Sequence, residues 1–167
     1  MFHVYDKLHL DLIPRRYTVE AGKSLNDHWR SAATPAENGD YDLWVYSSNG
    51  FVRTFKGNSL QWAQAGFKPE VQVCYDPAAG NVYLKVHNRG SEAGQVSITS
   101  NAYFSEGPWT LAVPANGSAE QHWDLTRSAH WYDFSVTAAH FERRFAGRVE
   151  TGRNGLSDPA MALHLQA

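Results

Sequence analysis

Apolar and polar residues alternate along most of residues 71–149, and turn-forming residues separate the alternating runs. A period of two predicts strands with one buried face, while Asp, Asn, Gly and Pro between runs predict turns. The predicted strands cover residues 71–75, 82–88, 95–101, 109–114, 119–125, 131–138 and 141–149. Seven short antiparallel strands within about 80 residues are typical of an immunoglobulin-like β-sandwich.

The first part of the chain repeats much of the second part, at an offset that drifts from 94 to 90 positions. A period of this size indicates a whole domain that occurs twice, rather than a short unit that stacks into a solenoid. The matched segments are His28-Trp29 with His122-Trp123, Tyr41-Asp42 with Tyr132-Asp133, and "FVRTFKG" (51–57) with "FERRFAG" (141–147). The expected fold class is therefore all-β, a repeated immunoglobulin-like antiparallel sandwich.

The first copy is predicted to be truncated at its N-terminus. Strands at 2–6 and 15–20 correspond to the third and fourth strands of the second copy, so nothing corresponds to the first two. We expect a partial first repeat over 1–57 with five of seven strands, a linker over 58–70 with a short helical turn, a complete repeat over 71–151, and a loosely packed tail over 152–167. Open sheet edges promote aggregation, so the partial repeat should lean on its neighbour or on the linker.

Composition narrows the classes of partner and site. A net charge of −2 gives no broad positive field for phosphate backbones, which argues against nucleic acid. Cys74 is the single cysteine, so an intrachain disulfide and a Cys-rich zinc site are excluded, and its alternating flanks predict a buried, inert thiol. The first residues, "MFHVYDKLHL", lack a basic segment followed by an apolar run, so we expect no signal peptide. No apolar run reaches the length of about 18 residues that a membrane helix needs.

Long strings of the sequence resemble one family. "WYDFSVTAAHFERRFAGRVETGRNGLSDP" (131–159) is similar to the closing strands of the C-terminal domain of bacterial phosphocholine-preferring phospholipases C. "FHVYDKLHLDLIPRRYTVEAGKSLND" (2–27) and "YDLWVYSSNGFVRTFKG" (41–57) resemble the latter part of a first copy of that domain. The resemblance implies a tandem accessory domain that follows a catalytic domain. The phosphodiesterase chemistry then belongs to that preceding domain, which is similar to metal-dependent phosphatases and acid phosphatases.

The repeated hairpin phrase (131–147) is interpreted as scaffold rather than as an active site. Its Phe and Val side chains alternate toward a core, Asp42 and Asp133 can accept from turn or cross-strand donors, and Gly57 and Gly147 suit a bulge or bend. The alternative is a hydrolase built across strands from histidines with Asp42 or Asp133. Catalysis seldom needs the same Asp-Arg pair twice, and the eight histidines lack metal-ligand spacing. We therefore expect no catalytic residue, no metal and no cofactor in this chain.

Basic residues occur in and beside the predicted strands: Lys7, Arg15, Arg16, Arg53, Arg143, Arg144 and Arg148. Consecutive strand residues point to opposite faces, so an arginine doublet cannot act as one patch. We interpret these residues as solvated strand faces, and a basic patch for phospholipid head groups is the alternative.

Trp62, Phe104 and Trp109 are the candidates for lipid contact, because tryptophan suits both the lipid interface and a choline group. Trp62 lies in the predicted linker and Trp109 beside Gly107-Pro108, away from the matched core positions. The expected function is an accessory module that supports the folding, export or substrate engagement of a parent phospholipase C, secreted or periplasmic, with the parent's catalytic domain as partner. The alternative is a module that itself binds choline lipids or membranes.

Overall fold

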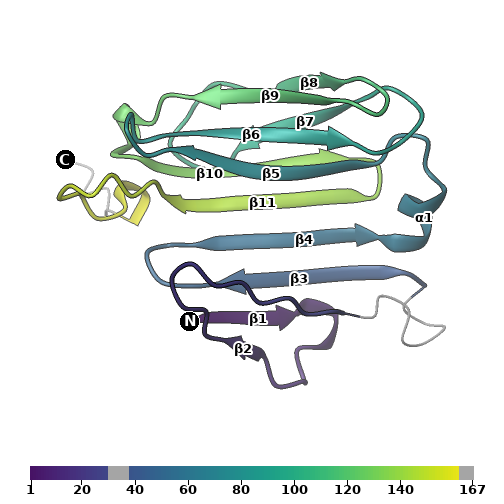
Figure 1. Cartoon of the computed structure of the whole chain (residues 1–167), viewed down its shortest axis with the longest axis horizontal. Coiled ribbons are helices and arrows are strands. Elements are labelled where there is room, and N and C mark those ends of the chain that lie inside the picture. Colours follow the sequence, from purple (N-terminus) through teal and green to yellow (C-terminus); the bar gives the residue numbers. More distant parts are fainter. Residues whose placement is uncertain (30–37, 162–167) are drawn as a thin grey trace, which may run out of the picture.

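The computed structural model describes residues 1–29 and 38–161, which form two stacked β-sheets with little helix. Within these residues the large sheet has eight strands in the order β2-β1-β3-β4-β11-β10-β7-β8, and the small sheet has three in the order β5-β6-β9. The small sheet lies over one half of the large sheet, and the half that contains the N-terminus extends away from it (Figure 1). The predicted all-β sandwich is confirmed.

All seven strands predicted for residues 71–149 form. They are β5 (Pro69–Asp76), β6 (Asn81–Asn88), β7 (Gly94–Ser100), β8 (Trp109–Val113), β9 (Ser118–Trp123), β10 (Trp131–Ala138) and β11 (Phe141–Arg148). Alternate side chains point between the sheets, so Val82, Leu84 and Val86 of β6 are fully buried while Tyr83 and Lys85 between them are partly exposed. The period of two thus predicted which face of the strand is buried.

The buried hydrophobic cluster belongs to these seven strands, the loops that join them and the residue after β11. Its members run from Val71 to Val149 along the chain. Near its centre the rings of Trp123 and Phe134 stack with centroids 4.2 Å apart. Because burial of apolar area is the main stabilising term in folding, the second half of the chain holds most of the stabilising contacts.

The first half of the chain adds four strands to the large sheet: β1 (Phe2–Asp6), β2 (Arg15–Tyr17), β3 (Asp40–Tyr46) and β4 (Val52–Asn58). β4 pairs with β11 in antiparallel fashion, from Val52 opposite Ala146 to Gly57 opposite Phe141. The backbone hydrogen-bonding groups along the edge of β4 are therefore paired with β11 of the second half. This pairing removes an open strand edge, which would otherwise promote aggregation. Along the sheet, β2-β1-β3-β4 and β8-β7-β10-β11 have the same relative order.

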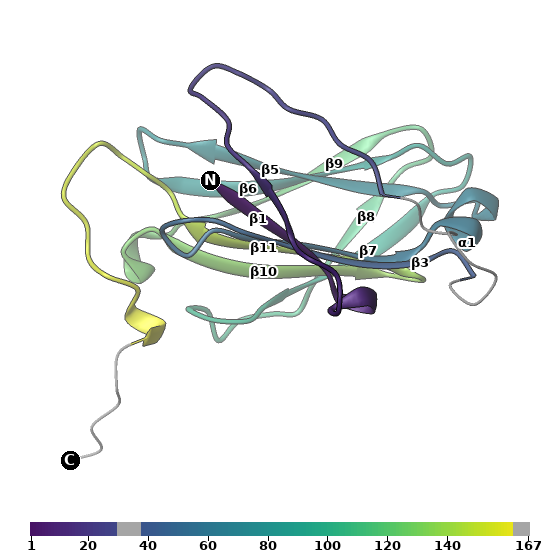
Figure 2. The ribbon, with the colours of Figure 1, turned by 90° about the horizontal axis from the view of Figure 1, so that it is seen from below.

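The five strands predicted for the first half are not all present, because residues 18–29 form no strand. This segment lies on the same side of the large sheet as the small sheet (Figure 2), where β9 lies in the second half. β9 is held by its pairing with β6, with Trp123 opposite Val82. The described residues of the first half contain no strand equivalent to β6. Because a strand needs a hydrogen-bonding partner, the segment remains irregular.

The predicted linker contains the expected helical turn, α1 (Ser59–Gln64). The side chain of Asn58 caps it by accepting a hydrogen bond from the backbone N–H of Gln61 at 2.9 Å. An asparagine at this position satisfies one of the helix's unpaired N–H groups. The cap therefore fixes the point at which β4 ends and the chain turns toward β5.

The tail is partly tied to the sheets. Trp131 Nε1 donates to the backbone oxygen of Leu156 at 3.1 Å. Residues 162–167 of the predicted tail lie outside the described residues.

Three short 3₁₀ turns complete the secondary structure of the described residues. They lie at Lys7–His9, Thr126–Ser128 and Pro159–Met161.

Cys74 differs from its predicted environment. It lies on β5 opposite Tyr83, on the outward face of the small sheet, and is half-buried rather than buried. β5 is an edge strand of this sheet, so the thiol is covered on one side only.

Candidate functional site: the seam between the two half-sheets

The two halves of the large sheet meet where β4 pairs with β11, and this seam contains two buried arginines, Arg53 and Arg143. Their exposed fractions are 7% and 6%. Arg53 lies opposite Phe145, and Arg143 lies opposite Phe55. The interpretation of these arginines as solvated is wrong, because both share the face of the sheet on which Phe145 joins the buried cluster.

Arg53 is held by oxygen atoms from four strands: its own strand β4, and β5, β10 and β11. Its Nη1 donates to the backbone oxygens of Val52 and Ala146, each at 2.7 Å. Its Nη2 donates to the hydroxyls of Tyr75 at 2.6 Å and Tyr132 at 3.0 Å. Burial raises the pKa of Tyr132, so that hydroxyl remains protonated. Most of the guanidinium donors are thereby satisfied without a carboxylate.

Arg143 makes matching contacts 90 positions along the chain. Its Nη1 donates to the backbone oxygens of Glu142 at 2.9 Å and Lys56 at 3.2 Å. Its guanidinium lies 4.1 Å from the ring centroid of Phe141, as that of Arg53 lies 4.2 Å from the centroid of Phe51. The backbone and phenylalanine contacts of the two arginines therefore correspond across the seam.

Both seam arginines also reach β5 of the small sheet. Arg53 contacts Tyr75, and Arg143 Nε lies 3.5 Å from Glu70 Oε1. The seam is tightly packed at its end, since a Cβ on Gly57 would lie 2.5 Å from the backbone oxygen of His140. The seam thus joins the first half, the second half and the small sheet. The guanidinium groups of Arg53 and Arg143 are engaged in contacts within the protein.

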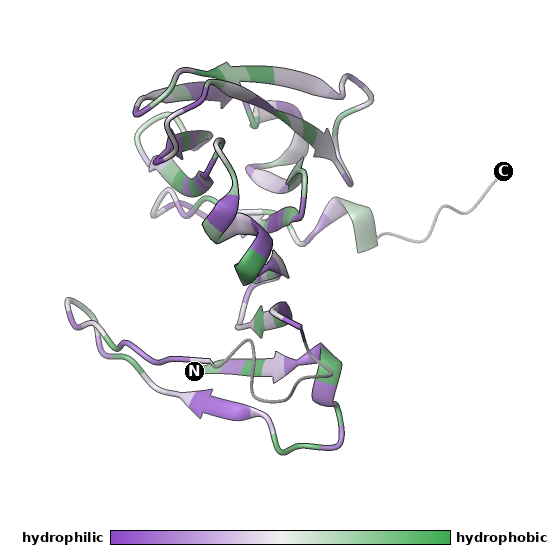
Figure 3. Ribbon diagram, turned by 90° about the vertical axis from the view of Figure 1, so that its right-hand side faces the viewer, coloured by the Kyte–Doolittle hydropathy of each residue, from purple (hydrophilic) through white to green (hydrophobic). Residues whose placement is uncertain are grey.

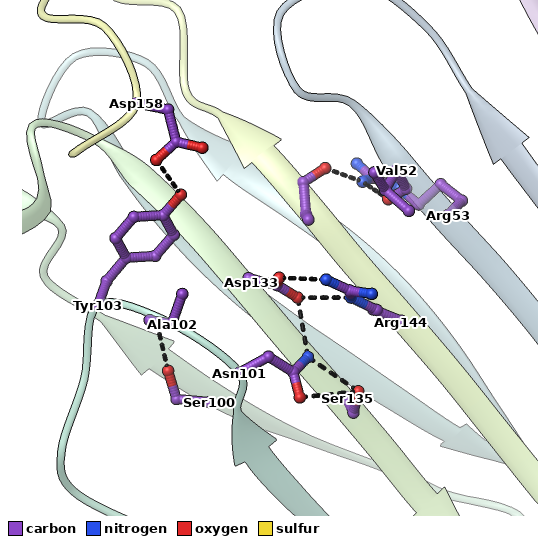
Figure 4. Close-up of polar contacts among 11 residues, drawn as sticks. Val52, Arg53, Ser100, Asn101, Ala102, Tyr103, Asp133, Ser135, Arg144 and Asp158 are labelled. Carbon is purple, nitrogen blue, oxygen red and sulfur yellow. Dashed lines mark hydrogen bonds and ion pairs between the residues drawn. The ribbon is translucent and has the colours of Figure 1, made fainter. Parts of the chain in front are cut away.

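A second polar network lies on the opposite face of the large sheet, on β10 and β11 (Figure 4). Arg144 binds Asp133 through two hydrogen bonds of 2.8 and 2.6 Å, and these raise the pKa of Arg144. Asn101 Nδ2 donates to Asp133 at 2.8 Å and to Ser135 at 2.9 Å. The prediction that Asp133 accepts from cross-strand donors is confirmed.

Asp42 is the counterpart of Asp133 in the first half, but it lacks the arginine partner that Asp133 has. It is 7% exposed, and within the described part of the chain its Oδ1 accepts no hydrogen bond. Thr54 takes the position that Arg144 has in the second half. Asp42 lines a cavity of about 430 Å³ together with His140. No hydrogen bond joins this histidine to Asp42 in the residues that the structure describes.

The three predicted lipid-contact residues are partly buried and pack against the core. Phe104 stacks on Phe134 with centroids 5.6 Å apart, and the ring of Trp109 meets the same phenylalanine edge to face. Trp62 lies in α1, where its Nε1 donates to the backbone oxygen of Pro69 at 3.4 Å. The structure thus brings Phe104 and Trp109 together and places Trp62 in a separate contact. Their contact with lipid stays a prediction.

The connection between β1 and β2 exposes aliphatic side chains that the sequence analysis missed. Their exposed fractions are 48% for Leu8, 65% for Leu10, 60% for Leu12 and 87% for Ile13. Leu10 also borders a cavity of about 460 Å³ with the aromatic side chains of Tyr5, Trp44 and Tyr46 on the outward face of β1 and β3. The available signal was the string "KLHLDLIP" (7–14), in which four of eight residues are aliphatic although it lies between two predicted strands.

Residues 1–29 and 38–161 contain no group of three or more His, Cys, Asp or Glu side chains that could hold a metal ion. Over the same stretches, no helix has the length and apolar character needed to span a membrane.

Comparison with known proteins assigns the chain to a family. The family described as bacterial phospholipase C, C-terminal domain, matches residues 1–58 and 69–148. The chain belongs to this family. Non-hemolytic phospholipase C of Pseudomonas aeruginosa is 40% identical over 98% of the chain, and that of Burkholderia pseudomallei is 42% identical over 89%. Hemolytic phospholipase C of P. aeruginosa is 38% identical over 89%.

The chain spans about a quarter of the length of these relatives, from 21% to 24% of each. It is therefore similar to one part of each phospholipase C, and the family description places that part at the C-terminal end.

Proposed function

We propose that this chain is a non-catalytic accessory domain of a secreted or periplasmic bacterial phospholipase C whose catalytic domain hydrolyses phosphocholine phospholipids. In this role the domain packs on the catalytic domain and supports its folding and export. The observation that carries the proposal concerns the charged side chains of the two matching hairpins, β3–β4 and β10–β11. Arg53 and Arg143 are engaged in contacts across the seam and with β5 of the small sheet, and Asp133 is paired with Arg144 across the β10–β11 hairpin.

The proposal is supported by where the buried charges lie. A catalytic arginine or carboxylate must face a cleft that a substrate can enter. The donors of Arg53 instead meet backbone oxygens and tyrosine hydroxyls beneath the small sheet. Because a buried guanidinium that loses its partners is strongly destabilising, these contacts have a structural use.

The test is deletion of this domain from a phospholipase C that carries it. The expected result is a large loss of soluble, exported enzyme, with turnover per folded molecule changed less than about threefold, since the reacting groups lie in the other domain. A deletion protein that is exported at the normal level contradicts the proposed role in folding and export. A folded deletion protein without turnover contradicts the non-catalytic assignment.

A second candidate function is binding to a phospholipid surface, and one observation favours it. Leu10, Leu12 and Ile13 are exposed on the β1–β2 connection, and Leu10 lies beside the aromatic rings of Tyr5 and Trp44. Aliphatic tips with aromatic and basic neighbours suit the interface of a membrane. Trp62, Phe104 and Trp109 remain the alternative contact residues, or the contacts of a choline group.

Co-sedimentation with phosphatidylcholine vesicles separates the two contact sets. If the β1–β2 connection inserts, Leu10→Asp with Ile13→Asp lowers the bound fraction at least tenfold, because each buried aliphatic side chain contributes about 1.5–3 kcal/mol. The double variant Trp62→Ala, Trp109→Ala then binds as the wild type does. The reverse result supports the second set. No binding by any variant or by the wild type contradicts the membrane function.

A further inference from the structure

The first half of the large sheet has an apolar face that the small sheet does not cover. We call it the uncovered face, and it is formed by Phe2, Val4, Leu43, Val45 and Phe55. Cross-strand register places Val4 opposite Val45 and Leu43 opposite Phe55, so these side chains lie on one side of the sheet. Apart from Val4, all of them are only partly buried. In Figure 3 the second half has two layers, whereas the half with the N-terminus has one sheet with a long loop beside it.

The uncovered face corresponds to the buried core of the second half. The offset of 94 relates Phe2 and Val4 to Val96 and Ile98, the offset of 91 relates Leu43 and Val45 to Phe134 and Val136, and the offset of 90 relates Phe55 to Phe145. These five counterparts are between 0% and 3% exposed. The same strand order and the same side of the sheet therefore carry a complete core in one half and an incomplete core in the other.

Residues 18–29 cover this face only in part. With it they border a cavity of about 300 Å³, to which Val19, Leu25 and Trp29 contribute. Trp29 corresponds to Trp123 at the end of β9, so this segment takes the place of the third strand of the small sheet. Leu25 is still 55% exposed. Strands equivalent to β5 and β6 are the elements that the described first half lacks.

We propose that the uncovered face is the docking site of a two-stranded β-hairpin from the parent polypeptide, equivalent to β5–β6 and entering β1 from its N-terminal side. The connectivity supports this occupant, because β6 passes into β7 through residues 89–93 and β1 is the counterpart of β7. Relatives about four times longer than this chain contain enough polypeptide to supply it. The hairpin presents alternate apolar residues to the face, as Val82, Leu84 and Val86 do in the second half.

A second copy of this chain fits the face less well. Each copy has residues 18–29 above its own face, so two copies would meet through these segments rather than through the apolar side chains. A hairpin can lie beside residues 18–29 on the same face, and its strand edge can pair with them. Residues 23–29 then gain a hydrogen-bonding partner and form a strand equivalent to β9. This inference holds whatever role the domain has in its parent.

The test supplies the hairpin from the chain's own sequence. Residues 69–94 are fused ahead of Met1, which the offset of 94 makes the counterpart of Gln95. The expected result is at least tenfold slower amide exchange at residues 23–29 and a fall in the fluorescence of the apolar dye ANS. A matched fusion, in which only the added copies of Val82, Leu84 and Val86 are changed to Ser, shows neither effect.

Three outcomes would overturn the proposal. The first is unchanged exchange at residues 23–29 in the fusion, and the second is equal slowing in the serine control. The third is a concentration-dependent dimer of the unfused chain in which this face is already protected, because a second copy is then the occupant. If the fusion does not fold, a synthetic peptide of residues 69–94 is added to the unfused chain, and the same amides decide the question.

Discussion

Arg53 and Arg143 place two permanent positive charges inside the sandwich. Arg53 is held by backbone and tyrosine oxygens, and Arg143 by backbone oxygens and one longer ion pair, with Glu70 at 3.5 Å. Arg53 contacts four oxygen atoms, of which two belong to the backbone and two to tyrosines. The planar fork of arginine can reach several acceptors at once, which the ammonium group of lysine cannot do from one position. At the scale of single residues, these hydrogen bonds explain why the phrase Phe-x-Arg-x-Phe occurs in both β4 and β11.

Arg53→Ala and Arg143→Ala should each lower the free energy of unfolding by about 2–4 kcal/mol, because they remove several buried hydrogen bonds and the packing of the side-chain stem. Arg53→Lys should recover less than half of this loss. Urea unfolding measures the change, and the exposed Arg89→Ala provides the control, with a change within about 0.5 kcal/mol. A seam variant as stable as the control contradicts the structural use of these arginines.

The two corresponding aspartates should respond differently to the same substitution. Asp133→Asn breaks the paired hydrogen bonds to Arg144 and should cost about 1–3 kcal/mol. Asp42→Asn should cost less than about 1 kcal/mol, since Oδ1 of Asp42 has no partner to lose. Thermal unfolding of both variants at neutral pH tests this. Equal destabilisation would show that Asp42 has a partner that the structure does not reveal.

At the scale of elements, strands with one buried face could be predicted from alternation, and strand pairing between distant segments could not. The runs around β6 and β10 have a period of two, which local sequence displays directly. The pairing of β4 with β11 depends on contacts between residues about 90 positions apart, and no local pattern encodes it. Arg143 was misjudged for this reason, because its burial follows from the neighbouring half rather than from its own hairpin.

The segment 18–29 also shows that local sequence does not determine strand pairing. Its sequence resembles that of β9, yet it forms no strand because its partner strand is not among the described residues. The exposure of the aliphatic side chains around Leu10 was likewise not predicted. Their string is unusual between two predicted strands, because loops are normally polar, but local sequence does not show whether another segment covers them.

Acid should loosen this segment. Asp27 accepts hydrogen bonds from Tyr17, from the backbone N–H of His28 and from Arg15, and these lower its pKa from 3.8 to about 2. A lowered pKa means that Asp27 holds the segment above about pH 4 and releases it as the pH falls through 2. The contact between the rings of Tyr17 and Trp29, followed by nuclear Overhauser effects, should therefore disappear near pH 2.

Two variants control the acid experiment. Asp27→Asn should lack the ring contact already at pH 5 and show no transition near pH 2. Glu20→Gln, at an exposed position of the same segment, should behave as the wild type does. A wild-type ring contact that persists to pH 1 contradicts the anchoring role of Asp27.

At the scale of the whole molecule, the two halves share one sheet but differ in how much of the core they hold. Among the described buried hydrophobic residues, Val4 is the one that belongs to the first half. The second half has its own closed cluster from Val71 to Val149. The first half is therefore stabilised by its pairing with β11 and by the seam arginines rather than by a core of its own.

Separate expression of the two parts should reflect this difference. Residues 59–161 should fold alone and unfold cooperatively in urea, because the buried cluster remains complete. Residues 1–58 should give the circular dichroism of an unfolded chain, since a single-layer sheet with one exposed apolar face is not stable by itself. A cooperative transition in 1–58, or its absence in 59–161, contradicts this division of the core.

The central claim is that this chain contributes structure and no chemistry to a phospholipase C, and hydrolysis by the purified chain tests it most directly. The chain is incubated with a chromogenic phosphocholine ester and divalent metal ions, beside the variants Asp42→Asn and His140→Ala, which alter the cavity that holds both side chains. The account predicts that release of product by all three proteins equals that of buffer. Turnover by the wild type that either substitution abolishes, in a protein that remains folded, would contradict it.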